Sequence, residues 1–285
     1  MSRVSWLNAL LLATVVGLGT YLYFKPARNA PAEYPLSALK PQEVKSIRVE
    51  RAGAPPLVIE RRESAWHVAE PFAARADALR VQQLLAILDA KSTHRLPAAG
   101  LDRFELERPE ARLTLAGQSF GFGMVSPITR EQYVLTGGAV YPIHPRYGAA
   151  LPGSATDAVS RLLFAADEMP VRIELKDFAV EQRDGRWALT PRAGDLSQDD
   201  LIRWVDEWQL AAALRVEPHA KGKARAEIQV RLKGGGGFSL GVLAREPELV
   251  LARSDEKLQY HFRAGLAQRL LSPPSAAGDD AVKKK

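Results

Sequence analysis

The 285-residue sequence contains no cysteine, and this absence removes several kinds of chemistry at once. Disulfides, thiolate metal sites, a cysteine nucleophile and a lipid-modified N-terminal cysteine are all excluded. A protein without cysteine is compatible with oxidising and reducing environments alike, so the absence does not indicate a compartment.

Recognisable catalytic and metal-binding signatures are missing too. The five histidines show no helical metal-ligand spacing and no HExxH motif, and no serine stands in a Gly-x-Ser-x-Gly elbow. The four glycines at 234–237 precede a predicted strand rather than the Lys-Ser/Thr and helix of a phosphate loop, which favours an ordinary turn. We therefore expect a protein that is not an enzyme, with no catalytic, cofactor-binding or metal-binding residues and no cofactor.

The sequence also lacks a concentrated basic stripe. Its net charge of +6 is modest, part of it comes from three C-terminal lysines, and the other charges of both signs are interspersed. Nucleic-acid-binding surfaces instead gather Lys and Arg on one face, so no nucleic-acid partner is predicted. With 46% apolar and 25% charged residues, the composition is that of a globular protein long enough for two domains.

Residues 6–24 form the one long stretch without charge, and its length matches a helix that crosses a bilayer. Aromatic residues stand at both ends, as in an interfacial aromatic belt. A cleaved signal peptide is the alternative, but the apolar core is too long and Ala30-Pro31-Ala32 is a poor, distant cleavage site. We interpret residues 1–24 as an uncleaved transmembrane anchor.

The charges that flank this anchor do not decide its orientation. Arg3 lies on one side and Lys25 and Arg28 on the other, which leans slightly against export of the C-terminal part. Long domains, however, translocate largely regardless of such charges. Residues 25–42 contain four prolines among small residues and are predicted to be a stiff tether without regular structure.

The remaining chain is organised around two similar hairpins. Residues 57–68 recur at 178–189 without a gap, so that Trp66 falls on Trp187. Each copy reads as a strand, a tight polar turn and a second strand. Around each hairpin the sequence predicts the same order of an early strand, the hairpin, a helix, a four-strand meander and a short helix.

This order predicts an α+β fold made by tandem duplication, with short and mostly antiparallel strands. The first unit is placed at residues 43–165 and the second at 166–271, followed by a disordered tail at 272–285. Asp77 is the predicted N-cap of a helix that runs to about Ser92. Ser197 and Asp200 resemble a capping box for the second helix, whose apolar face has Leu201, Val205, Trp208 and Ala212. Further helices are predicted at 156–164 and 264–271.

Six aromatic residues are candidate structural or interface positions. Trp66 and Tyr141 recur as Trp187 and Tyr260, where they either line a ligand groove or, as we favour, fill the core of each unit. Trp204 and Trp208 lie one turn apart and have no aromatic counterparts in the first unit. Their asymmetry hints at a specialised surface, such as a contact between the two lobes.

Two sets of carboxylates are candidate functional groups. Glu60 and Glu181 are equivalent in the two units, and paired carboxylates perform acid–base catalysis when their separation and pKa values are controlled. Their strand positions among basic neighbours favour a solvated face instead. The acidic residues at 199, 200, 206 and 207 are interpreted as a solvated helix face, with a partner contact as the alternative.

With the repeat laid out, the chain resembles the bacterial family known as domain of unknown function 4340. The pattern comprises Ile47-Arg48-Val49, Trp66-His67-Val68, the phrase from Leu101 to Pro109, Tyr133-Val134 and Val140-Tyr141. It covers about residues 44–151 well and the second unit more loosely. The resemblance implies one N-terminal membrane segment and, for some members, genes beside ABC transporter components of the gliding-motility type. It supplies no catalytic residues.

The sequence and this resemblance together lead to one main expectation. We expect a single-pass protein of the inner membrane, with a periplasmic body that binds a protein partner as an accessory of an ABC-type transport complex. One alternative is a module that binds a glycan or lipid in a cleft between the lobes. Another is an envelope hydrolase that uses the paired carboxylates. The identity of a small ligand stays open.

Overall fold

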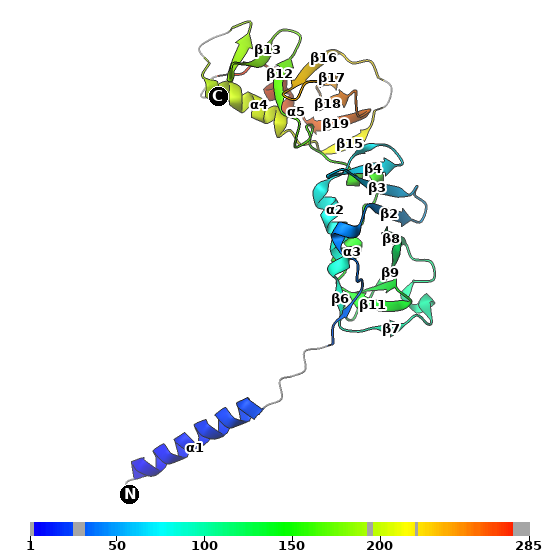
Figure 1. Cartoon of the computed structure of the whole chain (residues 1–285), viewed down its shortest axis with the longest axis vertical. Helices are drawn as coiled ribbons and strands as arrows, with labels where there is room; N and C mark the ends of the chain where they lie inside the picture. Colours follow the sequence, from blue (N-terminus) through cyan, green and yellow to red (C-terminus); the bar gives the residue numbers. More distant parts are fainter. Residues whose placement is uncertain (1–2, 25–31, 193–195, 220–221, 276–285) are drawn as a thin grey trace.

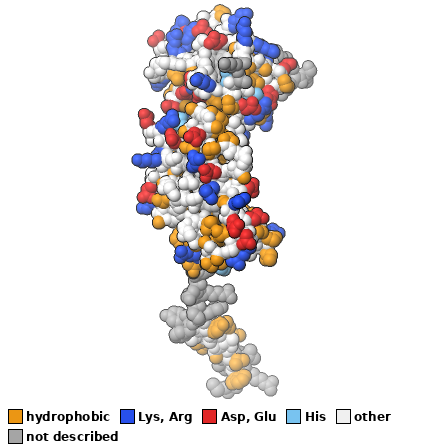
Figure 2. Space-filling view, turned by 90° about the vertical axis from the view of Figure 1, so that its right-hand side faces the viewer, with side chains coloured by type: hydrophobic (Ala, Val, Ile, Leu, Met, Phe, Trp, Pro, Cys, Tyr) orange, Lys and Arg blue, Asp and Glu red, His pale blue; other side chains and the backbone are white. Residues whose placement is uncertain are grey.

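The computed structural model describes residues 3–24, 32–192, 196–219 and 222–275 (Figure 1). After the N-terminal helix α1 (Arg3–Phe24), the chain forms a mixed α+β body of two lobes stacked end to end, each built on one antiparallel sheet. Charges of both signs are interspersed over the face shown in Figure 2. Of the helices within the described residues, none is both long and apolar enough to cross a membrane.

The first lobe contains a nine-stranded sheet in the order β5-β4-β3-β2-β8-β9-β10-β11-β7. Its strands are β2 (Ser46–Arg51), β3 (Leu57–Arg62), β4 (Ala65–Glu70), β5 (Ala74–Arg75), β7 (Leu96–Pro97), β8 (Ala111–Leu115), β9 (Gln118–Val125), β10 (Gln132–Thr136) and β11 (Ala139–Ile143). Helix α2 (Ala78–Leu85) continues as the 3₁₀ helix η2 (Ala86–Asp89) and packs its apolar face on the sheet. The shorter helices are η1 (Pro41–Glu43), η3 (Leu101–Phe104) and α3 (Arg146–Ala149).

The second lobe contains an eight-stranded sheet in the order β14-β13-β12-β16-β17-β18-β19-β15. Its strands are β12 (Pro170–Glu174), β13 (Ala179–Arg183), β14 (Arg186–Thr190), β15 (Arg215–Pro218), β16 (Ala226–Leu232), β17 (Gly237–Ala244), β18 (Glu248–Arg253) and β19 (Leu258–Arg263). Helices α4 (Gln198–Gln209) and α5 (Ala264–Leu271) pack against each other and against this sheet. The predicted helix at 264–271 is therefore observed with the expected bounds.

The strands of the two sheets correspond one to one when each sheet is followed from its Trp hairpin: the first runs from β4 to β7 and the second from β14 to β15. The first sheet has one additional edge strand, β5, beside β4. Both predicted hairpins are observed in the same register, with Trp66 opposite Arg61 and Trp187 opposite Gln182. Each is closed by a two-residue turn whose first residue has a positive φ angle, in the left-handed region. The φ angles are 54° at Glu63 and 50° at Asp184.

Local sequence signals explain the helix starts. The carboxylate of Asp77 accepts a hydrogen bond from the backbone N–H of Arg80 at 2.9 Å and thereby caps α2. At α4 the hydroxyl of Ser197 accepts from the N–H of Asp200 at 3.2 Å, while the carboxylate of Asp200 accepts from the N–H of Ser197 at 3.0 Å. This reciprocal pair is a capping box, so both predicted helix starts are confirmed.

Two predicted helices are too long. The first ends at Asp89, because Lys91 and Ser92 form strand β6, which pairs with β1 (Tyr34–Pro35), and the Ser92 hydroxyl donates to the carbonyl of Pro142 at 2.7 Å. The predicted helix at 156–164 is wrong beyond the 3₁₀ helix η4 (Ala155–Ala158). There the backbone makes bridges to both lobes, Ala76 with Val159 and Leu162 with Ala212, which replace helical hydrogen bonds. Ala212, which was predicted on the apolar face of the second helix, lies beyond the end of α4 and is exposed.

The predicted tether is only partly described, because residues 25–31 lie outside the described residues. From Tyr34 onward the expectation of no regular structure is wrong, since β1 pairs with β6 and Leu36 is buried. The N–H of Leu36 donates to the carbonyl of Ala90 at 3.1 Å. Residues 276–285 of the predicted disordered tail also lie outside the described residues.

The lobes are joined through a shared interior rather than through a free linker. One cluster of buried apolar side chains runs through both lobes. The connecting segment hydrogen bonds to both of them: the N–H of Asp77 donates to the carbonyl of Ala158 at 2.8 Å, and the N–H of Ala213 donates to the carbonyl of Arg161 at 2.8 Å. These bonds fix the connector on both sides.

Candidate binding groove

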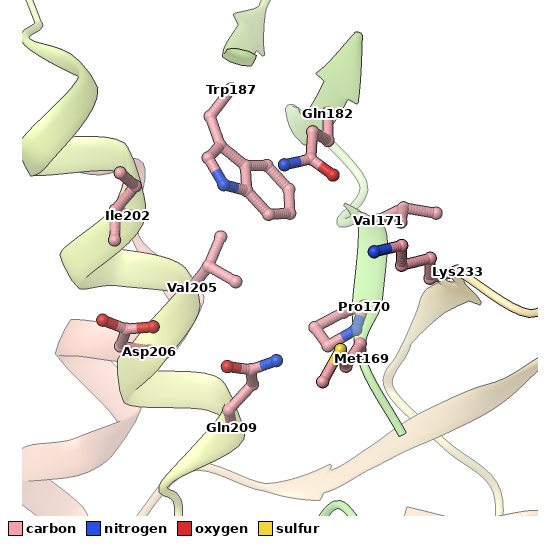
Figure 3. Close-up of a pocket in the computed structure, with 10 residues that line it drawn as sticks. All are labelled: Met169, Pro170, Val171, Gln182, Trp187, Ile202, Val205, Asp206, Gln209 and Lys233. Carbon is pink, nitrogen blue, oxygen red and sulfur yellow. The ribbon is translucent and has the colours of Figure 1, made fainter. Parts of the chain in front are cut away.

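A groove of about 280 Å³ lies in the second lobe between helix α4 and strands β12 to β14 (Figure 3). Val205 from the helix and Pro170 and Val171 from β12 give it apolar walls, and Trp187 from β14 lies at one end. Met169 and Ile202 at its rim are 54% and 41% exposed. We call this feature the Trp187 groove.

The local fold holds the walls of this groove in place. The backbone N–H of Trp187 donates to the side-chain carbonyl of Gln198 at 2.8 Å, and the amide nitrogen of Gln198 donates back to the carbonyl of Trp187 at 2.8 Å. Because Gln198 is the first residue of α4, this clamp ties the hairpin to the capped end of the helix. Ile202, Asp206 and Gln209 follow at spacings of four and three and therefore share one face of α4.

Four polar side chains around the groove are uncommitted. Asp206 and Gln209 belong to the helix wall, and Gln182 and Lys233 to the opposite side. Within the described part of the chain, none of these four side chains makes a hydrogen bond or an ion pair. The groove therefore combines an apolar floor with free donors, acceptors and opposite charges, a composition typical of binding sites.

The six aromatic candidates have different environments. Trp66 and Trp187 are both partly buried and packed against the core, and Trp187 also lines the groove. Tyr141 and Tyr260 are buried, at 7% and 0% exposure.

The idea that Trp204 and Trp208 mark a specialised surface is wrong. Both side chains are buried within the second lobe, because their i, i+4 spacing turns them together toward the sheet. Trp204 lies edge-on to Phe178 and to Trp208, with ring centroids 5.7 and 5.9 Å apart. Its indole N–H donates to the carbonyl of Ser272 at 3.1 Å, so this indole is a satisfied core group.

The equivalent carboxylates are not brought together. Glu60 belongs to the sheet of the first lobe and lies 3.6 Å from Arg62, whereas Glu181 belongs to the sheet of the second lobe and pairs with Arg172 and Arg183. The described residues contain no group of three or more His, Asp or Glu side chains arranged to hold a metal ion. Glu60 and Glu181 therefore do not form a pair of carboxylates at one site.

A buried ionic contact closes the junction between the lobes. Arg75, on edge strand β5 of the first lobe, forms an ion pair with Glu256 in the β18–β19 turn of the second lobe. The Arg75 guanidinium also donates to the hydroxyl of Tyr260 at 3.0 Å and to the carbonyl of Leu162 at 2.8 Å. The Tyr260 hydroxyl in turn donates to Glu256. The side chains of Arg75 and Glu256 are only 18% and 11% exposed.

A second arginine extends this network inside the second lobe. Arg253 is 2% exposed, pairs with Glu168, donates to the carbonyl of Leu163 at 2.6 Å and lies over the ring of Phe238 at 3.7 Å. Burial lowers the pKa of Arg253, but the hydrogen bonds to Glu168 and Asp255 together with the negative charges of Glu256 and Glu168 outweigh it, and the pKa is raised. Burial and the neighbouring carboxylate of Glu256 raise the pKa of Tyr260. Arg253 therefore stays charged and Tyr260 protonated at neutral pH.

Sequence reasoning missed Arg75 and Arg253, because neither residue belongs to the repeated pattern. One difference between the two units could have indicated this junction. The turn between β18 and β19 has four residues, Ser254 to Lys257, where the corresponding turn of the first lobe has only Gly137 and Gly138. These extra charged residues, present in one unit only, supply Glu256 to the junction.

Comparisons with known proteins give one match. The family described as a domain of unknown function (DUF4340) matches residues 66–223, more than half of the chain. This span begins at Trp66, in the second strand of the first hairpin, and includes Arg75, the connector, α4 and most of the Trp187 groove. No curated protein and no solved structure matches the chain significantly.

Proposed function

The chain belongs to the DUF4340 family, and from this membership we propose that it is a membrane-anchored, non-enzymatic binding protein of the bacterial envelope. Its role would be that of an accessory to an ABC-type transport complex. The observation that carries the binding role is the Trp187 groove, with its uncommitted polar side chains, on a body whose lobes are fixed together.

The N-terminal segment motivates the anchor, although none of the described helices meets the length and apolarity of a membrane span. Residues 6–24 carry no charge, and helix α1 covers them. Large apolar side chains along it are exposed, including Leu11 at 63% and Leu12 at 68%. Such a surface is stable in an apolar surrounding, because burial of apolar area is favourable. In this proposal the N-terminus is cytoplasmic and the body lies in the periplasm.

The likeness of the two sheets supports the proposal that the body arose by tandem duplication. The strand order, the register of the Trp hairpins and the capped helix after each hairpin all correspond. Duplication followed by divergence explains why the lobes share an architecture while only the second has Trp204, Trp208 and the charged β18–β19 turn.

The junction disfavours the alternative of a glycan or lipid site between the lobes. The space where such a cleft would open is occupied by Arg75, Glu256 and Tyr260. The hydrolase alternative is also disfavoured, because Glu60 and Glu181 lie on different sheets and pair with separate arginines.

The test is purification of the full chain from native membranes in mild detergent. We expect one membrane complex to be retained, with transporter subunits identified by mass spectrometry. A protein that is recovered alone would contradict the accessory role. Independently, a C-terminal reporter active only outside the cytoplasm should give a signal; activity of a cytoplasm-specific reporter would contradict the proposed orientation.

A further inference from the structure

From the surface around Trp187 we infer that the groove is one end of an apolar track that binds an extended, aliphatic segment of a partner protein. The inference rests on the proposed function and deepens it, because it names the surface and the chemistry through which the partner is held.

Further exposed aliphatic side chains belong to the chain that follows the groove-lining helix and to the connector. Met169 and Ile202 line the groove, Leu210 directly follows Gln209 at the end of α4 and is 75% exposed, and Leu214 and the connector residue Leu162 are 40% and 44% exposed. The bridge between Leu162 and Ala212 places the connector beside the chain that leaves α4. We call this surface the apolar track.

The dimensions of the track suit an extended peptide. Ile202 and Leu210 are separated by eight residues, which at about 1.5 Å per residue corresponds to roughly 12 Å along α4. An extended segment rises about 3.3 Å per residue, so roughly four residues cover this part of the track. Alternate side chains of such a segment point to the same face and can enter the groove together.

The uncommitted polar groups complement a peptide. The amides of Gln182 and Gln209 each offer donors and an acceptor, and a peptide main chain presents both kinds of group. Asp206 and Lys233 carry charges of opposite sign that no described residue pairs with, so a basic side chain of the segment would face Asp206.

A sugar fits this surface less well. Its hydroxyl groups would lose water against Met169, Ile202 and Leu210, which cannot replace those hydrogen bonds. Aliphatic side chains of a partner would instead gain from burial at the same positions. The aliphatic rim therefore favours a protein segment.

Site-specific photocrosslinking in native membranes tests this inference. The photoreactive residue benzoylphenylalanine replaces Ile202 or Leu210 in the full chain, and the control carries it at Leu79, which is 63% exposed on α2 of the first lobe. We expect both track positions to crosslink to one short segment of one protein, mapped by mass spectrometry. The yield at Leu79 should be lower by about tenfold. Crosslinks only to lipid, to glycan or to a second copy of this chain would overturn the inference.

A substitution pair separates failure of the inference from failure of the proposed function. Ile202→Asp should reduce recovery of the crosslinked partner by about tenfold, because a charge is placed in the apolar contact, whereas Leu79→Asp should leave recovery unchanged. Equal thermal unfolding of the two variants establishes that the fold is retained. If the partner co-purifies equally with Ile202→Asp and the unmodified chain, the track is wrong and the accessory role stands. If the unmodified chain retains no partner, both are wrong.

Discussion

The guanidinium group of Arg75 in the first lobe donates a 3.0 Å hydrogen bond to the hydroxyl of Tyr260 in the second. Both groups also contact Glu256, so three polar side chains from two lobes satisfy one another away from water. A buried ionic contact is costly to break, because the partner that remains is left desolvated. This contact therefore adds to the shared apolar interior and the bonded connector in fixing the relative placement of the lobes.

Arg75→Ala should destabilise the full chain by about 3 kcal/mol, because it removes the hydrogen-bonded cation of the buried Glu256 carboxylate and leaves only the longer 3.8 Å contact with Arg253. Denaturant unfolding measures the loss. Adding Glu256→Gln should restore part of it, since no unpaired charge then remains. Arg48→Ala is the matched control: the Arg48–Glu50 pair is 43% and 41% exposed, and its loss should cost less than about 1 kcal/mol. Equal losses for Arg75→Ala and Arg48→Ala would show that the junction contributes no more than a surface pair.

Ionisation of Tyr260 should report on the same junction. Its pKa is raised above the ordinary value of 10.0 by burial and by the carboxylate of Glu256. A raised pKa contributes stability that is fully present below pH 10 and is lost as the pH rises through the folded pKa. Near-ultraviolet titration of the seven tyrosines should therefore show a phenol that ionises late, and Tyr260→Phe should remove it. An unchanged late phase in the variant would assign that phase to another tyrosine.

Close packing at Gly123 predicts a local effect in the first lobe. A Cβ atom there would lie 2.1 Å from the carbonyl oxygen of Phe104, a backbone atom that cannot move away freely. Gly123→Ala should consequently destabilise the protein by about 2 kcal/mol. Gly265→Ala in α5 is the control, because nothing lies within 4 Å of its added Cβ and alanine favours the helix by about 0.5 kcal/mol. Unfolding midpoints that move in the same direction would refute this account of Gly123.

Features set by neighbouring residues could be predicted from the sequence. The Trp hairpins follow from alternation and turn residues, and the start of α4 follows from Ser197 and Asp200 alone. The β-rich α+β class with antiparallel sheets could be predicted for the same reason.

Features that depend on distant partners could not be predicted. Tyr34 and Pro35 become a strand only because Lys91 and Ser92 lie beside them, and the connector is extended because both lobes bond to its backbone. Of the Trp187 groove, the hairpin and the helix were predicted separately, with Trp187 among the candidates. The hydrogen bonds through which Gln198 joins them could be seen only in the folded structure.

We propose that the body is held at a membrane to bind a partner complex, and the mass of the particle in detergent tests this proposal most directly. The chain alone has a mass of 31.2 kDa. Native mass spectrometry after gentle solubilisation should find it in a larger particle of fixed composition that contains transporter subunits. Recovery only as a 31.2 kDa species, or in a particle made solely of copies of itself, would contradict the claim.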